Sequence, residues 1–149
     1  MDHVGARKVR SLVSLRRSSM RQHRRQVTIL AAVIRLVCAG LLIWTGVIHL
    51  HLWFEGYRHI PTNGPMFLLD GLTALLLSAA LVVLPRPVIG LLGAGFLVAT
   101  LGALIISINV GLFGFKELLS ASFVELSLVI ESIAAIGLLS WAALVVAGP

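Results

Sequence analysis

Four long apolar blocks alternate with short polar segments along this chain. The blocks cover residues 27–53, 66–84, 88–113 and 122–146, and each is close to or longer than the ~20 residues with which an α-helix crosses a bilayer. A helix also satisfies its backbone hydrogen bonds internally, as lipid requires. The pattern therefore predicts an all-α integral membrane protein, a four-helix bundle.

The segments between the blocks contain the residues that end helices. Residues 55–65 hold two prolines and two glycines and predict an ordered turn. The sequence Pro-Arg-Pro at 85–87 predicts a tight break, and residues 114–121 predict a polar loop. These boundaries divide the chain into a basic amino-terminal segment, residues 1–26, and a transmembrane domain, residues 27–149.

The amino-acid composition also indicates that lipid surrounds these blocks. The chain is 58% apolar and 12% charged, against about 45–50% and about 25% in an ordinary soluble domain. Its mean hydropathy is +1.02. A soluble domain of this length hides its apolar side chains in one core, whereas here they form blocks without interruption. An ordinary soluble fold is therefore excluded.

The positive charge is concentrated before the first block. The net charge is +6, and eight of the twelve Lys and Arg precede residue 26. Basic residues flanking a span stay in the cytoplasm, so both termini of a four-span chain are predicted to be cytoplasmic. Only Arg58 and Lys116 then lie outside. The basic segment is expected to be a surface helix or disordered, and to contact anionic lipid rather than nucleic acid.

The third block carries small residues at every fourth position, which lines them along one side of a helix. Small side chains let helices approach closely in lipid. We expect this stripe to be a packing seam inside the bundle, or a contact with a second copy or another membrane protein. The stripe consists of Gly95, Ala99, Ala103, Ser107 and Gly111.

The ionisable side chains gather at the predicted outer side. Asp70 and Glu131 lie within spans, where each costs about 2.5–3.5 kcal/mol and usually faces the bundle interior or a water-filled cavity. His49 and Asn109 lie at the same level of the other two spans. These four residues form either a pocket for protons, cations or another ligand, or a structural hydrogen-bond network.

Two further sites are candidates at the end of the first block. His51, Glu55 and His59 are spaced four apart and would share a helical face for a metal ion, although Gly56 interrupts such a helix. Trp53, Tyr57 and Arg58 are candidates for contacting an anionic headgroup or a quinone. The chain has no HExxH, CxxC, phosphate-loop or nucleophile-elbow motif, so no catalytic residue, enzyme activity or cofactor is predicted.

Several segments resemble small four-span membrane proteins of actinobacteria. They are HLHLW at 49–53, GYRHIPT at 56–62, GPMFLLD at 64–70 and GLFGFKE at 111–117, so the likeness covers residues 45–135. In layout the chain is also similar to the DoxX-like four-helix membrane proteins. The resemblance implies a four-helix membrane fold in a bacterial inner (plasma) membrane and implies no reaction.

These features predict an accessory, scaffold or ligand-binding membrane component with an outward-facing polar layer. The alternative is a small proton-coupled transporter, or a membrane oxidoreductase that uses a metal or a quinone. The two differ in one structural feature. If Asp70, Glu131 and His49 converge on one cavity, the transporter or oxidoreductase is favoured. If each group instead hydrogen-bonds to a neighbouring loop or faces lipid separately, a scaffold is favoured.

Overall fold

The protein is a bundle of four long α-helices. The computed structural model describes residues 3–148, without the side chains of residues 3–15, 17 and 18. All four helices are long and apolar enough to cross a membrane, and the described residues form no strand. The predicted all-α membrane fold is confirmed. In chain order the elements are α1 (His3–Glu55), the 3₁₀ helix η1 (Tyr57–His59), α2 (Asn63–Val83), α3 (Pro87–Asn109) and α4 (Val124–Ala147).

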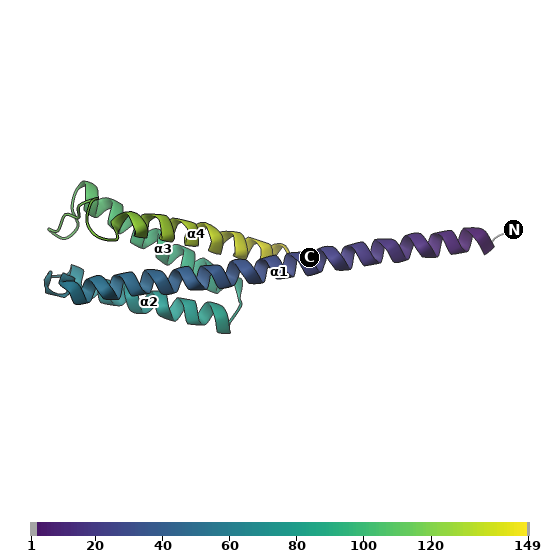
Figure 1. Ribbon diagram of the computed structural model, residues 1–149, viewed down its shortest axis with the longest axis horizontal. Helices are drawn as coiled ribbons and strands as arrows, with labels where there is room; N and C mark the ends of the chain where they lie inside the picture. The colour runs from purple at the N-terminus through teal and green to yellow at the C-terminus, as the bar shows by residue number, and fades with distance from the viewer. Residues whose placement is uncertain (1–2, 149) are drawn as a thin grey trace.

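Helix α1 is much longer than the first apolar block. It includes residues 3–26 of the basic segment and projects well beyond the other helices (Figure 1). Residues 3–26 contain no proline and one glycine, so nothing in them breaks a helix. The basic segment therefore continues the membrane helix. The side chains of residues 3–15, 17 and 18 lie outside the described part of the structure, and so do their contacts.

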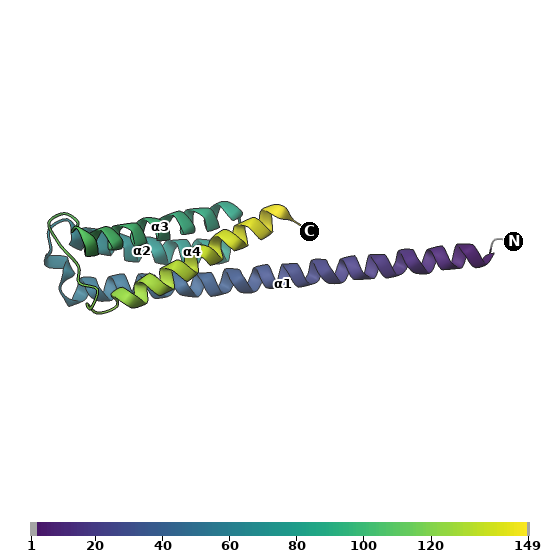
Figure 2. The same ribbon diagram turned by 90° about the horizontal axis from the view of Figure 1, so that it is seen from above.

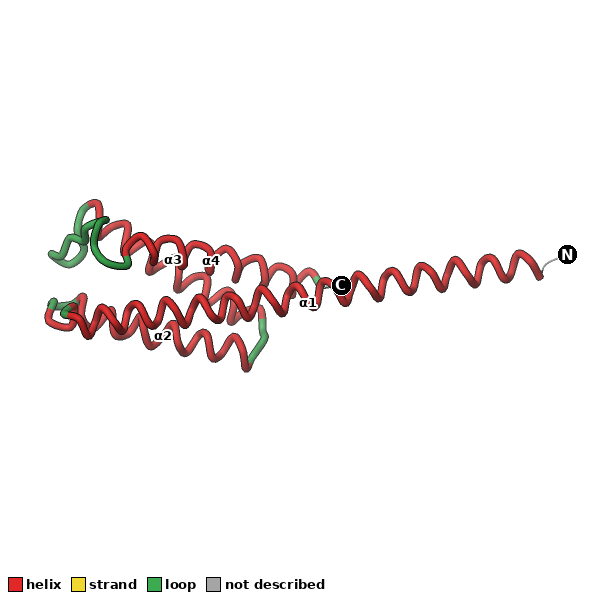
Figure 3. The backbone as a smooth tube through the Cα atoms, in the orientation of Figure 1, coloured by secondary structure: helices red, strands yellow, loops and turns green. Residues whose placement is uncertain are grey.

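The helices run alternately up and down. Helix α1 packs against α2 and α4, α3 packs against α4, and α2 and α3 touch each other least. Residues 56–62 and 110–123 form one end of the bundle, which we call the loop end (Figure 3). The α2–α3 turn and the carboxyl terminus lie at the opposite end, called the packed end (Figure 2).

The half of the bundle nearer the packed end is filled by apolar side chains. Leu42, Leu81, Leu97 and Leu138 are fully buried there. Glycines allow close approach. A Cβ added at Gly90 would lie 2.7 Å from the Trp141 ring, and one at Gly93 would lie 2.9 Å from Leu138. One at Gly137 would lie 2.6 Å from Cys38 Sγ. This half therefore has no room for a ligand.

The first half of the predicted small-residue stripe of α3 does not pack inside the bundle, and its contact with a second copy or another membrane protein stays a prediction. Gly95 and Ala99 are exposed, and a Cβ added at Gly95 would meet nothing within 4 Å. Ala103 is half-buried and Ser107 is buried. A repeat of four drifts around a helix of 3.6 residues per turn, by roughly 120° over twelve residues. The buried face begins instead with Gly90, Gly93, Ala94, Leu97 and Thr100.

Apart from the start of α1, two helix ends differ from the predicted spans by three residues or more. Helix α3 ends at Asn109 rather than at Phe113, because Gly111 takes a left-handed conformation, φ 89°, and residues 112–115 form a tight turn. Gly111, the fifth residue of the stripe, therefore lies in the loop and not in α3. Helix α2 begins at Asn63 rather than at Met66, because Pro65 lies in its first turn, where a proline is tolerated.

Candidate functional site

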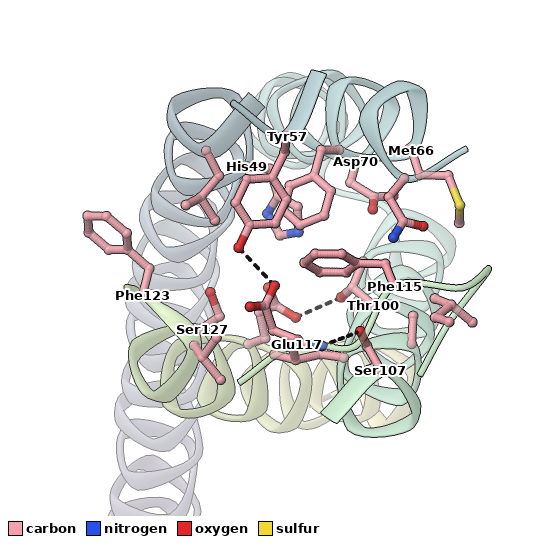
Figure 4. A pocket seen from close by; sticks show the side chains of 18 of the residues that line it. His49, Tyr57, Met66, Asp70, Thr100, Ser107, Phe115, Glu117, Phe123 and Ser127 are labelled. Carbon is pink, nitrogen blue, oxygen red and sulfur yellow. Dashed lines mark hydrogen bonds between the residues drawn. The ribbon is translucent and has the colours of Figure 1, made fainter. Parts of the chain in front are cut away.

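A cavity of about 90 Å³ lies between the helices in the half of the bundle nearer the loop end. All four helices, η1 and the loop 110–123 contribute side chains to it (Figure 4). One buried water needs roughly 10–15 Å³ measured in this way. The cavity therefore has room for several waters or for one compact ligand.

Three of the four predicted pocket residues meet in this cavity. His49 comes from α1, Asp70 from α2 and Glu131 from α4, and all three line it. Figure 4 shows His49 and Asp70 on the same side, with Glu117 opposite them. Asn109 does not line the cavity. It is exposed, and its side-chain amide donates to the Ile105 carbonyl at 2.8 Å.

The ring of His49 is oriented by its own helix. Its Nδ1 lies 2.9 Å from the Thr45 carbonyl oxygen, one turn earlier. A carbonyl oxygen only accepts, so Nδ1 carries a proton. Nε2 is thereby left to accept a hydrogen bond or to take up a second proton. His49 can therefore exchange a proton within the cavity without losing its orientation.

Glu131 is the most deeply buried ionisable group, with 1% of its surface exposed. The Thr100 hydroxyl lies 2.7 Å from Glu131 Oε2 and 2.9 Å from the Leu97 carbonyl oxygen. One hydroxyl proton serves one acceptor at a time. Thr100 can donate to an ionised Glu131, or accept from a protonated Glu131 and donate to Leu97. This pairing suits both protonation states of Glu131.

Asp70 has no comparable partner. It is half-buried, and no hydrogen bond reaches it from the other residues drawn in Figure 4. His49 and Asp70 line the same cavity as Glu131, and charges inside a membrane protein are little screened from one another. The three groups therefore form one electrostatically linked set, in which a proton or charge at one site changes the others.

A third carboxylate, Glu117, closes the cavity at the loop end. Tyr57 Oη donates to Glu117 Oε2 at 2.9 Å, and Glu117 Oε1 accepts from the Leu118 amide at 3.2 Å. The Glu117 amide donates to the Ser107 hydroxyl at 3.3 Å. Burial and the adjacent carboxylate raise the pKa of the Tyr57 phenol far above its usual range. The loop 110–123 is thus tied to η1 and α3.

Aromatic rings form much of the remaining wall. The ring centroids of Tyr57 and Phe67 are 4.6 Å apart, those of Tyr57 and Phe115 5.8 Å, and those of His49 and Phe67 5.4 Å. All four rings line the cavity. The wall therefore combines a few ionisable groups with a largely aromatic surface, which is typical of small-molecule sites.

The predicted headgroup residues do not act as a group. Tyr57 lines the cavity, whereas Trp53 and Arg58 do not. Trp53 packs edge-on against Phe54 at 4.9 Å. Arg58 is exposed, and its Nε donates to His59 Nε2 at 3.1 Å. Of the three, only Tyr57 is part of the site.

The predicted metal residues are also separated. His51 and Glu55 pair at 3.3 Å on α1, but α1 ends there and Gly56 adopts a φ of 146°, so His59 leaves the helical face. Within the described part of the chain, no three His, Cys, Asp or Glu side chains gather closely enough to hold a metal ion.

Four polar residues of the cavity have no recognisable signal in the sequence. Thr100 and Ser107 are hydroxyl residues of a kind common in any membrane helix. Asn63 and Glu117 lie in or next to loops, where polar residues are expected at an interface. Asn63 is 5% exposed, and its Oδ1 atom is buried with no hydrogen-bond partner. Only the folded arrangement shows that it faces a cavity.

Comparison with protein-family models, with curated proteins and with solved structures gives no match to this chain. Its function is therefore inferred from the residues of the cavity.

Proposed function

We propose that this small multi-pass membrane protein binds a compact ligand in its loop-end cavity and exchanges protons there with water. The observation that carries the proposal is the convergence of His49, Asp70 and Glu131 from three helices on one cavity. Ionisable groups inside a membrane are costly, and they commonly mark ligand sites and proton pathways.

The protonation chemistry of the site supports proton exchange. Thr100 accommodates both forms of Glu131, and the free Nε2 of His49 can take up or release a proton. Asp70 is half-buried and so lies nearest to water of the two membrane carboxyls. A proton can thus enter at Asp70 and be shared with His49 and Glu131.

The convergence of His49, Asp70 and Glu131 favours a proton-handling protein over a scaffold, and the packing of the interior favours ligand binding over transport through the bundle. Leu42, Leu97 and Leu138 belong to the apolar core and do not line the cavity, and the glycine contacts in that core are tight. Transport through the bundle requires these contacts to separate. A proton-coupled transporter is the second candidate, favoured by the limited contact between α2 and α3, which is the seam that could open.

We place the chain in a bacterial plasma membrane with its loop end outward and both termini in the cytoplasm. The support is the distribution of Lys and Arg and the likeness to actinobacterial four-span proteins. Arg21, Arg24 and Arg25 are exposed on the projecting part of α1. They are available to anionic lipid headgroups, each contributing about 1 kcal/mol near such a surface.

Cysteine labelling tests access to the cavity. In a Cys38→Ala background, Ser127→Cys places a thiol in the cavity wall, and Ser140→Cys places one on the exposed side of the same helix. A membrane-impermeant thiol reagent added to intact cells should label Ser127→Cys. It should leave Ser140→Cys unlabelled, because a thiol facing lipid does not ionise.

Either of two results would contradict the proposal. An unreactive Ser127→Cys in intact and in opened cells would show that water does not reach the cavity. Labelling only after the cells are opened would show that the loop end faces the cytoplasm.

A further inference from the structure

The charges around the cavity are unbalanced. Asp70, Glu117 and Glu131 line it together with His49 and Tyr57, and none of the described lining residues is Lys or Arg. Glu117 is satisfied by Tyr57 and the Leu118 amide. Asp70 and Glu131 have no basic partner other than His49. A buried carboxylate requires a proton or a positive charge next to it.

Asn63 is independent evidence for a ligand that donates hydrogen bonds. It lines the cavity from the first turn of α2 and is 5% exposed, and its Oδ1 atom has no partner. Buried polar atoms in folded proteins are nearly always paired. A carbonyl oxygen only accepts, so the missing partner is a donor, such as an N–H group.

The aromatic wall suits the same kind of ligand. Phe67, Phe115 and Tyr57 lie around the cavity with their ring centroids 4.6–5.8 Å apart. Aromatic faces attract cations, and alkylammonium ions above all. A metal ion is a poorer fit, because it needs several ligands around one point, and no three ligating side chains of the described residues gather in that way.

We propose that the ligand of this cavity is a compact alkylammonium ion, held by the carboxylates of Glu131 and Asp70, the Asn63 side-chain carbonyl and the surrounding rings. This inference rests on the proposed function and names its ligand class. The cavity volume of about 90 Å³ limits the ligand to a few heavy atoms, well below the size of ligands that fill sites of about 300–1,000 Å³.

Binding of such a cation displaces a proton. Without the ligand, Glu131 or Asp70 holds a proton. The positive charge of the entering ammonium replaces the charge of that proton. The proton leaves to water, and the Thr100 hydroxyl changes from acceptor to donor toward Glu131. The titratable groups that face the ligand are His49 from α1, Tyr57 from η1, Asp70 from α2, Glu117 from the loop and Glu131 from α4; α3 contributes none.

Three compounds that share a tert-butyl group test the ligand class on the full chain in detergent: tert-butylammonium, tert-butanol, which has the same shape without the charge, and the anion pivalate. We expect calorimetric binding of tert-butylammonium alone, with release of a proton into a weak buffer. Because one proton competes with one cation, affinity should rise about tenfold per pH unit across the titration of the carboxyls.

Variants locate the binding. Glu131→Gln and Asp70→Asn should each weaken tert-butylammonium binding at least tenfold and reduce the proton release. Asp70 is half-buried, so its variant tests the site even if Glu131→Gln folds poorly. Glu125→Gln is the matched control, because Glu125 is an exposed carboxylate of α4 outside the cavity, and its affinity should equal that of the native protein.

Two results overturn the inference. Equal binding of tert-butanol or pivalate, with the same dependence on Asp70 and Glu131, would show that the cavity binds ligands of another class and leave the proposed function standing. No binding of tert-butylammonium at any pH also refutes the ammonium ligand. The labelling of Ser127→Cys then decides whether the proposed function fails with it.

Discussion

Single hydrogen bonds between residues determine which groups of the cavity can change their charge. Thr100 has two acceptors within reach of one proton, so it does not fix the charge of Glu131. Tyr57 and Glu117, in contrast, form a pair in which the phenol must remain protonated to donate. The first arrangement permits a change of charge within the cavity, and the second holds the loop above it.

The Tyr57–Glu117 pair can be observed directly, because Tyr57 is the only tyrosine of the chain. An alkaline titration followed by phenolate absorbance should show ionisation well above the usual pKa of about 10. Glu117→Gln should lower that pKa, since it removes the negative charge beside the phenol. Glu125→Gln should leave it unchanged, and an unaltered titration in Glu117→Gln would refute the pairing.

The same pair makes stability depend on pH in a defined direction. The pKa of Tyr57 is raised by folding. The contribution of Tyr57 to the free energy of unfolding is therefore fully present below the pKa of the unfolded chain. It is lost as the pH rises through the pKa of the folded protein. The loop end should loosen only in strongly alkaline solution.

At the scale of elements, the pattern of apolar blocks predicts the four helices well. Length and hydropathy suffice, because lipid admits few other structures. The ends of helices are predicted less well, since the positive φ of Gly111 depends on the turn that follows it. The face of a helix that packs is hardest to predict. The sequence does not show which of Gly90 and Gly95 lies on the packed face, yet only a Cβ at Gly90 would contact the Trp141 ring.

Two matched substitutions in α3 test this packing. Gly90→Ala places a Cβ 2.7 Å from the Trp141 ring, whereas Gly95→Ala places one in open space. We expect Gly90→Ala to lower the free energy of unfolding by about 1–3 kcal/mol. Gly95→Ala should be neutral or stabilising by up to about 1 kcal/mol. Equal effects of the two in equilibrium unfolding in mixed micelles would contradict the packed face described for α3.

The whole molecule combines two halves with different properties. The half nearer the packed end is close-packed around Leu81 and Trp141, and the half nearer the loop end encloses an acidic, aromatic cavity. The sequence predicts that Asp70, His49 and Glu131 lie at one level. Whether they meet depends on the rotation of each helix about its axis, which is also why Asn109 points outward. Helix rotation follows from packing contacts that are not local in the sequence.

We expect Asp70 and Glu131 to serve ligand binding and not stability, and thermal unfolding of their isosteric variants separates these two roles. Glutamine keeps a side-chain oxygen that can accept from Thr100, and both amides remove the cost of burying an acid, so neither replacement should weaken the protein. We therefore predict that Glu131→Gln and Asp70→Asn melt at the temperature of the native protein or above it, as Glu125→Gln should. A structural network would instead lose about 1 kcal/mol or more in each variant, a fall of about 4 °C, and that result would contradict the account.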